Sequence, residues 1–412
     1  MSMNDCVVMI LAGGKGSRIY PLSRDRAKPA IPFGGKYRII DFVLNNLINS
    51  GYYQIYVLTQ FKSQSLNKHI EKGWRMSPQL GHFISLVPAQ MRTGVTWYRG
   101  TADAIYQNFN LFDEENPHAQ HVMVFGGDHI YKMDVNQFYD YHIQKDADLT
   151  VCVIPVDKEK ASEFGVVEVD EEWRIIGFQE KPKEPKTIPG KPNKVLVSMG
   201  NYIFKKDIII RELIRGEKED RPEYDFGKHT IPQMINRCKV YAYDFSRNTH
   251  PGMSENERGY WKDVGTIDSY YEANMDLVSV TPQLNLYNSQ WPLRTYDPPY
   301  PPVKFVFENI EENRVGHALD SIVSSGCIIS GGTVVKSVLS PGVRVNSYSL
   351  VEESILMEKV VIGRHCKIRR AIIDKEVIVP EGTVIGYNIE EDRKRFFVTE
   401  SGITVIPKKE KI

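Results

Sequence analysis

The stretch VVMILAGGKGSR, from Val7 to Arg18, decides the fold class of this chain. Its first six residues form an unbroken apolar run, which is typical of a strand buried on both faces of a parallel sheet. Glycines follow at once, and they let the backbone turn tightly and direct its amide groups at a phosphate. The loop lacks the closing Gly-Lys-Ser/Thr of a Walker A motif, and Ile19 replaces the third glycine of a dinucleotide fingerprint. The stretch therefore predicts a strand and an anion-binding loop, with a purely structural turn as the alternative.

Strand-like and helix-like segments alternate along the first 280 residues. Apolar residues recur at helical spacing over 39–48, and further strand candidates lie at 54–59, 122–125 and 149–156. Apolar strands separated by helices predict an α/β fold with a doubly wound, mostly parallel, Rossmann-like sheet. Ligands of such sheets bind beyond the carboxyl ends of the strands, so the residues that follow each strand are the functional candidates.

The pattern changes after residue 281. Four prolines between Pro298 and Pro302 predict a stiff, extended connector, so we expect domains over 1–281 and 303–412 joined by a linker over 282–302. Beyond it, apolar residues recur every six positions in two blocks, namely Ile322, Ile328 and Val334, then Val360, Cys366, Ile372, Ile378 and Val384. This period predicts a parallel β-helix, with an irregular β-sandwich as the alternative. The blocks are out of phase, so an insertion or a shifted turn must separate them.

Composition excludes several classes of partner. The chain carries 52 Lys and Arg against 52 Asp and Glu, and this zero net charge argues against nucleic acid or an anionic membrane as a ligand. The apolar run that ends at Ala12 is far too short to span a bilayer. The five cysteines are scattered without a C-x-x-C pair, which predicts reduced thiols and a cytoplasmic protein.

Two aspartates follow or precede predicted elements in positions that suit catalysis. Asp128 in FGGDHIY emerges at the end of a predicted strand, and Asp263 in YWKDVGT stands just before a predicted helix. Two carboxylates suit a hard ion such as Mg²⁺, which uses one or two carboxylates together with substrate phosphate. For Asp263 alone the alternative is an acid that merely stabilises a helix start, and we take His129 as a structural neighbour.

Cations beside the glycine loop strengthen its assignment to phosphate, and residues in four other motifs predict a pocket for a phosphorylated sugar. Lys15 and Arg18 in the glycine loop and Lys28 in AKPA place three positive charges near one another. Lys181 in QEKP ends a strand-like run and precedes a proline, although a lysine there is more often a solvated surface residue. The motifs TWYRGTADA, FGVV, QEKP and VSMGNY complete this set, with Tyr98, Gly165, Glu180, Lys181 and Ser198 as the candidates.

Together these motifs resemble the bacterial glucose-1-phosphate adenylyltransferases, also called ADP-glucose pyrophosphorylases. The resemblance runs from about Val7 to the C-terminus and rests on LAGGKGSRIYPLSRDRAKPA, FGGKYRIIDFVLNN, WYRGTADAIYQN, GGDHIY, FGVVEVD, FQEKP, VSMGNYIF, DFGKHTIP and YWKDVGT. It implies a sugar nucleotidyltransferase domain, a left-handed β-helix for regulation and oligomerisation, and a cytoplasmic homotetramer or a heterotetramer with a paralogous subunit. It also implies Mg²⁺-dependent synthesis of ADP-glucose from ATP and glucose 1-phosphate for glycogen or starch.

The resemblance also assigns roles to residues. Asp128 and Asp263 would hold Mg²⁺, and the catalytic residues would be Arg18, Lys28 and Asp128. Glucose 1-phosphate would contact the five candidates Tyr98, Gly165, Glu180, Lys181 and Ser198. The nucleotide would contact Leu11, Ala12, Gly13, Gly14, Lys15, Gln60 and Gln90. Allosteric candidates are Arg26 and Arg38, at family positions that bind AMP, and the C-terminal pair Lys394 and Arg395.

Three other functions remain open on sequence alone. The loop does not determine the base, so a nucleotidyltransferase for UTP or dTTP is one alternative. A catalytically silent regulatory subunit is the second, although Arg18, Asp128, Lys181 and Asp263 are all present. The third is an acyltransferase, since hexapeptide β-helices often carry that chemistry with a catalytic histidine; His317 and His365 are the histidines past the linker.

Overall fold

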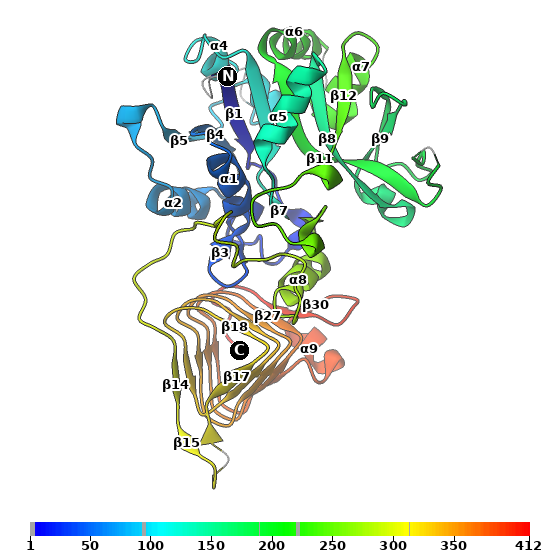
Figure 1. Cartoon of the computed structure of the whole chain (residues 1–412). Helices are drawn as coiled ribbons and strands as arrows, with labels where there is room; N and C mark the ends of the chain where they lie inside the picture. The colour runs from blue at the N-terminus through cyan, green and yellow to red at the C-terminus, as the bar shows by residue number, and fades with distance from the viewer. Residues whose placement is uncertain (1–4, 93–95, 189, 220–222, 313) are drawn as a thin grey trace.

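The computed structural model describes residues 5–92, 96–188, 190–219, 223–312 and 314–412. An α/β part, coloured blue to green in Figure 1, sits above a coiled β part coloured yellow to red. No helix in the described ranges has the length and apolar character needed to cross a membrane.

A nine-stranded mixed sheet forms the centre of the α/β part. Its main path runs β10-β9-β11-β6-β1-β4-β5, and β8 and β12 extend the sheet from β11. The bounds are β1 (Cys6–Leu11), β4 (Gln54–Thr59), β5 (Phe83–Pro88), β6 (His121–Gly126), β8 (Leu149–Asp157), β9 (Gly165–Val169), β10 (Ile175–Glu180), β11 (Lys194–Lys205) and β12 (Val240–Asp244). β1 is parallel to β4 and β6, β5 is parallel to β4, and β12 is parallel to β8. The long β11 runs antiparallel to β6 and β8 between the two parallel groups.

Helices cover both faces of this sheet, which confirms the doubly wound α/β prediction. Alternate side chains of β1 point to opposite faces of the sheet. Val8 and Ile10 pack in one apolar cluster, and Val7 and Met9 pack in another. The first cluster includes residues of α1 (Ile39–Asn49), α2 (Gln64–Gly73) and α5 (Val135–Gln144). The second includes residues of α3 (Thr101–Tyr106), α4 (Asn110–Asp113), α6 (Lys206–Glu217) and α7 (Ile231–Met234). Burial on both faces explains why the β1 sequence is apolar without alternation.

The C-terminal part is a left-handed parallel β-helix with three sheets. The first sheet stacks β14 (Lys304–Val306), β19 (Ile328–Ser330), β22 (Arg344–Val345), β25 (Val361–Ile362) and β28 (Ile378–Val379). The second stacks β17 (His317–Leu319), β20 (Thr333–Val335), β23 (Leu350–Glu352), β26 (Lys367–Arg369) and β29 (Val384–Ile385). The third stacks β18 (Ile322–Val323), β21 (Val338–Leu339), β24 (Ile355–Leu356), β27 (Ala371–Ile373), β31 (Thr404–Ile406) and β30 (Phe397–Val398). The hairpin of β15 (Glu308–Asn309) and β16 (Arg314–Val315) projects from the first coil (Figure 1).

The repeat is less regular than six residues throughout, and this corrects the sequence analysis. The interior positions, all fully buried in one cluster, are Val345, Val351, Leu356, Ile362, Ile368, Ile373, Val379 and Ile385. Two steps of six and one step of five make up each coil of this series, and the step of five leads from the second sheet to the third. The uninterrupted series that ends at Ile378 and Val384 is therefore wrong as a core ladder: these two side chains are 67% and 45% exposed.

The two parts pack against each other through the third sheet of the β-helix. One apolar cluster combines Phe33 and Tyr270 of the α/β part with Ile355, Ile372 and Val405 of the coils. Tyr270 belongs to α8 (Ile267–Asp276), which lies directly above the coils in Figure 1. The segment between α8 and β14 runs extended alongside α1. There Asn45 exchanges two hydrogen bonds with the backbone of Arg294, each 2.8 Å long.

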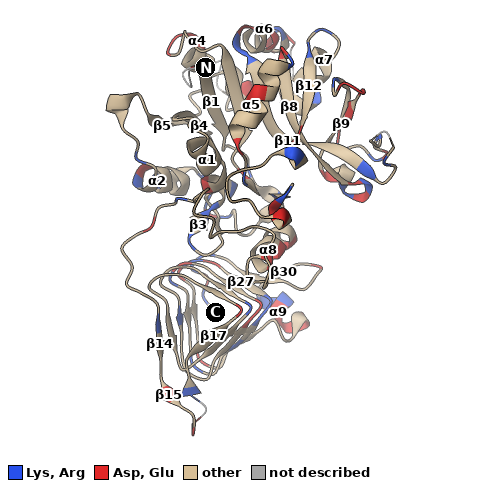
Figure 2. Cartoon of the chain, in the orientation of Figure 1, with Lys and Arg blue, Asp and Glu red and all other residues tan. Residues whose placement is uncertain are grey.

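Charged pairs accompany this apolar contact. Arg26 donates to both carboxylate oxygens of Asp374 at 2.9 Å, and both side chains are almost fully buried. Arg38 contacts Glu358 at 3.1 Å, and Lys375 contacts the same carboxylate at 2.9 Å. Lysines, arginines and acids are otherwise interspersed over both parts (Figure 2), in keeping with the zero net charge.

Candidate active site

A cleft of about 590 Å³ opens at the carboxyl ends of β1, β4 and β6 and extends beneath β9, β10 and β11. Sequence-predicted residues form much of its lining: Leu11, Ala12, Gly13, Gly14, Lys15, Arg18, Lys28, Gln60, Tyr98, Asp128, Gly165, Glu180, Lys181 and Ser198. The position beyond the strand ends is the one that a doubly wound sheet predicts.

The glycine loop forms the wall of the cleft after β1. Gly16 adopts φ +60°, and a Cβ there would lie 3.3 Å from the Cβ of Lys28. At Gly13 an added Cβ would come within 3.1 Å of the Gln60 Cβ, whereas Gly14 has open space around it. Ser23 fixes the loop by donating to the Gly16 carbonyl at 2.8 Å. The loop can thus bring its backbone close to a phosphate at Gly13 and Gly14.

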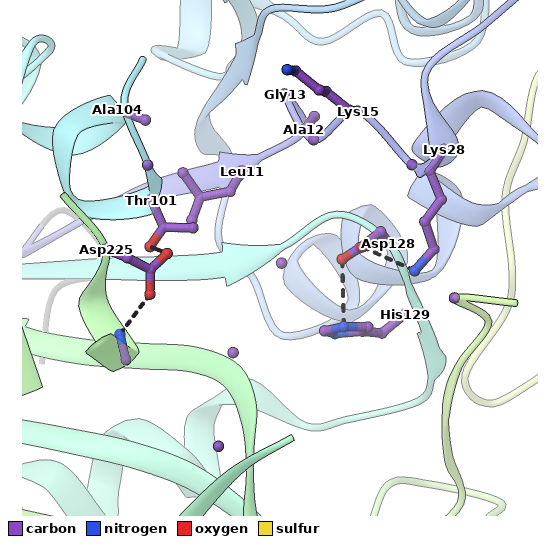
Figure 3. Close-up of a pocket in the computed structure, with 18 of the residues that line it drawn as sticks. Leu11, Ala12, Gly13, Lys15, Lys28, Thr101, Ala104, Asp128, His129 and Asp225 are labelled. Atoms are coloured by element: carbon purple, nitrogen blue, oxygen red, sulfur yellow. Dashed lines mark hydrogen bonds and ion pairs between the residues drawn. The ribbon is translucent and has the colours of Figure 1, made fainter. Parts of the chain in front are cut away.

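Asp128 and Asp263 meet through strand pairing. Asp128 follows β6 by two residues, and Asp263 ends β13 (Trp261–Asp263). β13 pairs with β7 (His129–Tyr131) so that Asp263 lies opposite His129. Lys28 completes the group, because its Nζ donates to Asp128 at 3.0 Å and to Asp263 at 2.8 Å. Figure 3 shows Lys28 and His129 both pointing at Asp128.

The charges in this group stabilise one another. Burial disfavours ionisation of Asp128, but the charges of Lys28 and Arg18 hold its pKa well below the ordinary value. Burial likewise disfavours the charged lysine, yet Asp128 and Asp263 together raise the pKa of Lys28. Arg18 adds a longer ion pair with Asp263 at 3.6 Å. At neutral pH the cluster therefore holds an ionised Asp128 beside a protonated Lys28.

The acid pair also fits a divalent ion. Ligand atoms of Asp128, His129 and Asp263 lie within 4.8 Å of one another. The Nδ1 atom of His129 is buried and has no hydrogen-bond partner among the described residues. In the sequence only its adjacency to Asp128 marks His129, which is why it is expected there as a structural neighbour. Two carboxylates without a thiolate match the oxygen preference of Mg²⁺.

The other end of the cleft collects the predicted sugar residues. Glu180 at the end of β10 pairs with Gly165 at the start of β9, where a Cβ would come within 2.6 Å of Phe178. Burial raises the pKa of Glu180. Lys181 adopts φ +48°, its side chain is 52% exposed, and its Nζ lies 3.8 Å from Glu180. Ser198 stands where the register of β11 against β8 shifts, and this irregularity turns the strand at the cleft.

Several predicted residues lie elsewhere. Gln90 is not part of the cleft lining, and its side-chain oxygen accepts from Arg92 at 3.4 Å on the surface. Lys394 and Arg395 end α9 (Ile389–Arg395) at the edge of the β-helix. Lys394 pairs with Glu391 one turn away at 2.7 Å. Arg26 and Arg38 are in ion pairs between the two parts, with Asp374 and Glu358 respectively.

Sequence reasoning missed polar groups at the sugar end. Thr101 donates to Asp225 at 2.7 Å, and both residues line the cleft, as do Tyr202 and Trp261. Asp225 also accepts from the backbone of Gly227 at 2.9 Å, where it caps the short helix over Phe226–Thr230. The motifs RGTADA and DFGKHTIP contained Thr101 and Asp225, but nothing local showed that they meet (Figure 3).

Comparisons with known proteins match both parts of the chain. The family model described as nucleotidyl transferase matches residues 7–280, and the GlmU-like C-terminal hexapeptide model matches residues 301–406. A protein from Anaeromyxobacter sp. (strain Fw109-5) is 56% identical over 98% of both chains. A protein from Thermus thermophilus is 56% identical over 97% of both chains, and one from Deinococcus radiodurans is 52% identical over 97% of both. Each of these relatives is named glucose-1-phosphate adenylyltransferase.

Proposed function

The chain belongs to the glucose-1-phosphate adenylyltransferase family of nucleotidyl transferases, and we propose from this that its cleft joins ATP and glucose 1-phosphate into ADP-glucose and diphosphate. The observation that supports this most strongly is one cleft lined by the glycine loop, Lys28, Asp128 and Lys181, with Asp263 hydrogen-bonded to Lys28. The reaction is the first step of glycogen or starch synthesis.

The reaction needs no protein nucleophile. Phosphate monoesters have a second pKa of about 6, so glucose 1-phosphate is largely dianionic at neutral pH and can attack the α-phosphorus in line. The obstacle is charge repulsion, since two unit charges about 4 Å apart repel by roughly 4 kcal/mol at an effective dielectric near 20. Positioning and local cations therefore supply the catalysis.

The residues of the cleft divide this work. Amides of Gly13 and Gly14 with Lys15 and Arg18 would hold the triphosphate and favour departure of diphosphate. Lys181, reaching from the other end, would hold the phosphate of the sugar. Both sets line the same cleft, so the attacking oxygen and the α-phosphorus can meet between them.

Nucleotidyl transferases of this family use a divalent metal ion, and we assign Mg²⁺ as that ion. Asp128 and Asp263 would hold it, because hard oxygen ligands suit Mg²⁺ and the two carboxylates share one cation already in Lys28. When bound, the ion supplies positive charge to the reacting phosphates. Lys28 forms ion pairs with both carboxylates, and Arg18 forms a longer one with Asp263.

The domain roles and the assembly are also proposals. Residues 1–281 would carry the catalysis, 282–302 would link, and 303–412 would serve regulation and assembly of a cytoplasmic homotetramer, or a heterotetramer with a paralogue. Exposed apolar side chains on the first coil and its hairpin, namely Phe305, Leu319 and Ile310, support an interface there. Arg26 and Arg38 lie between the two parts, which supports communication between regulation and catalysis.

A nucleotide panel tests the function. We expect diphosphate release with ATP and glucose 1-phosphate to exceed release with UTP or dTTP by at least about tenfold, which corresponds to roughly 1.4 kcal/mol of discrimination. Initial rates of diphosphate formation at equal nucleotide concentrations measure it. Faster turnover with UTP or dTTP would support a sugar nucleotidyltransferase that uses that nucleotide. No turnover with any nucleotide would support a silent regulatory subunit.

Lys181→Ala tests the sugar end of the cleft. We expect KM for glucose 1-phosphate to rise about ten- to a hundredfold, because a hydrogen bond to a charged group contributes roughly 1.5–3 kcal/mol. KM for ATP should change little, since the glycine loop and not Lys181 is proposed to hold the triphosphate. Steady-state kinetics with each substrate varied in turn measures the split.

The matched control for Lys181→Ala is Lys183→Ala, two residues along the chain and outside the cleft lining. It removes the same charge and should leave both KM values near those of the parent. Equal increases in both KM values for Lys181→Ala would mean that this lysine is structural or contacts the nucleotide.

A further inference from the structure

The paired carboxylates of the cleft are already neutralised by the chain itself. Lys28 bridges them, with its Nζ 3.0 Å from Asp128 Oδ2 and 2.8 Å from Asp263 Oδ1. Its side chain is only 6% exposed, so the ammonium depends on these two acids for its solvation. Arg18 lies 3.6 Å from the second oxygen of Asp263. Two negative and two positive charges thus balance within one small group.

A metal ion and this lysine compete for the same oxygens. Mg²⁺ binds carboxylate oxygens at about 2.0–2.1 Å, and an ion held by both aspartates would have to lie between them, where the Lys28 ammonium now lies. Positive charges at such separations repel strongly in a recessed site. The two cations therefore exclude one another, and one must leave before the other can be held.

A bound triphosphate would offer the Lys28 ammonium an alternative partner. Lys28 lines the same cleft as the glycine loop, and its Cβ lies beside Gly16 of that loop. A triphosphate at the loop brings several negative charges within reach of the flexible lysine stem. Charge-assisted hydrogen bonds to phosphate are strong enough to replace those to the carboxylates.

We propose that Lys28 guards the metal site: in the free chain it bridges Asp128 and Asp263 and keeps a divalent ion out, and the triphosphate draws it away as the ion enters. The proposal rests on the assignment of the metal to these two aspartates made above. It predicts that metal and nucleotide enter together, so that carboxylates, lysine and phosphates are never left without a counter-charge.

Lys15 provides a matched control within the same cleft. It carries the same charge, and its Nζ lies 5.3 Å from the centre of the Phe61 ring. Figure 3 shows it pointing away from Asp128, and it pairs with no carboxylate among the described residues. Removing its charge alters the net charge of the cleft equally without freeing the acid pair.

The test is Mn²⁺ binding to the full chain without nucleotide, followed by the electron paramagnetic resonance signal of free Mn²⁺. We expect Lys28→Met to bind Mn²⁺ at least about tenfold more tightly than the parent, because the acid pair loses its internal cation. Lys15→Met should bind as the parent does. Lys28→Gln is a second variant with the same expected gain in Mn²⁺ affinity. It retains a hydrogen-bond donor and so guards against poor folding of the apolar variant.

The outcomes separate this inference from the function on which it rests. Equal Mn²⁺ affinity in Lys28→Met, Lys28→Gln and the parent would overturn the guard proposal while leaving the metal assignment intact. If the tighter Mn²⁺ binding of Lys28→Met persists in Lys28→Met/Asp263→Asn, the ion binds elsewhere. That result would overturn both the guard proposal and the metal assignment. An equal gain in Mn²⁺ affinity in Lys15→Met would mean that the net charge of the cleft causes the effect. That result would overturn the specific role of Lys28.

Discussion

Asp128→Asn is expected to lower kcat by about 10²–10³-fold, the usual loss when one preorganised electrostatic group is removed. The substitution preserves size but removes one of the two charges proposed to hold the metal ion. Lys28 retains its contact with Asp263 at 2.8 Å, so the fold of the cleft should persist. Initial rates at saturating ATP, glucose 1-phosphate and Mg²⁺ measure kcat, and calorimetric titration with glucose 1-phosphate tests whether sugar binding survives.

Asp157→Asn is the control for this variant. Asp157 is an exposed residue that pairs with Lys194 at 2.8 Å and does not line the cleft, so kcat should stay within about twofold of the parent. The metal assignment would not survive an Asp128→Asn variant whose kcat is close to that of the parent with Mg²⁺ in excess.

Arg26→Met is expected to lower the free energy of unfolding by about 3–5 kcal/mol, because breaking a buried ion pair leaves an uncompensated charge. The side chains of Arg26 and Asp374 are only 3% and 2% exposed, and two hydrogen bonds of 2.9 Å join them across the two parts of the chain. Urea unfolding followed by circular dichroism measures the change. Arg26→Met/Asp374→Leu should recover most of it, since apolar replacement of a whole buried pair is often neutral.

Arg24→Met is the matched control at the same interface. Arg24 pairs with Glu410 at 3.0 Å, but both side chains are more than a third exposed, so the loss should be about 0–1 kcal/mol. Similar losses for both variants, or no recovery in the double variant, would mean that burial does not distinguish the two pairs.

Local sequence patterns carried the fold class and much of the cleft. The apolar run before the glycine loop can be recognised within a dozen residues, because burial on both faces removes the alternation of an ordinary strand. The rule that ligands bind beyond strand ends then placed Asp128 and the loop at the same edge. The hexapeptide period indicated the β-helix, although exposed Ile378 and Val384 are also apolar and disguised the five-residue step.

Contacts between distant segments could not be obtained in this way. Gln90 is a candidate for the base by its chemistry alone, and in the structure its side chain contacts Arg92 and is not part of the cleft lining. Thr101 and Asp225 meet although 124 residues separate them. The type of a side chain can suggest its role. Which residue it contacts depends on the path of the folded chain.

The sequence by itself determined the two kinds of fold, the family and many of the residues that face the cleft, because strand burial, glycine loops and coil repeats are encoded by neighbours along the chain. Only the tertiary structure decided that Lys28 lies between Asp128 and Asp263, and that Arg26 is paired with Asp374. These contacts join residues 100, 235 and 348 positions apart. Electrostatic energy depends on separation in space and on burial, and neither quantity exists until the chain has folded.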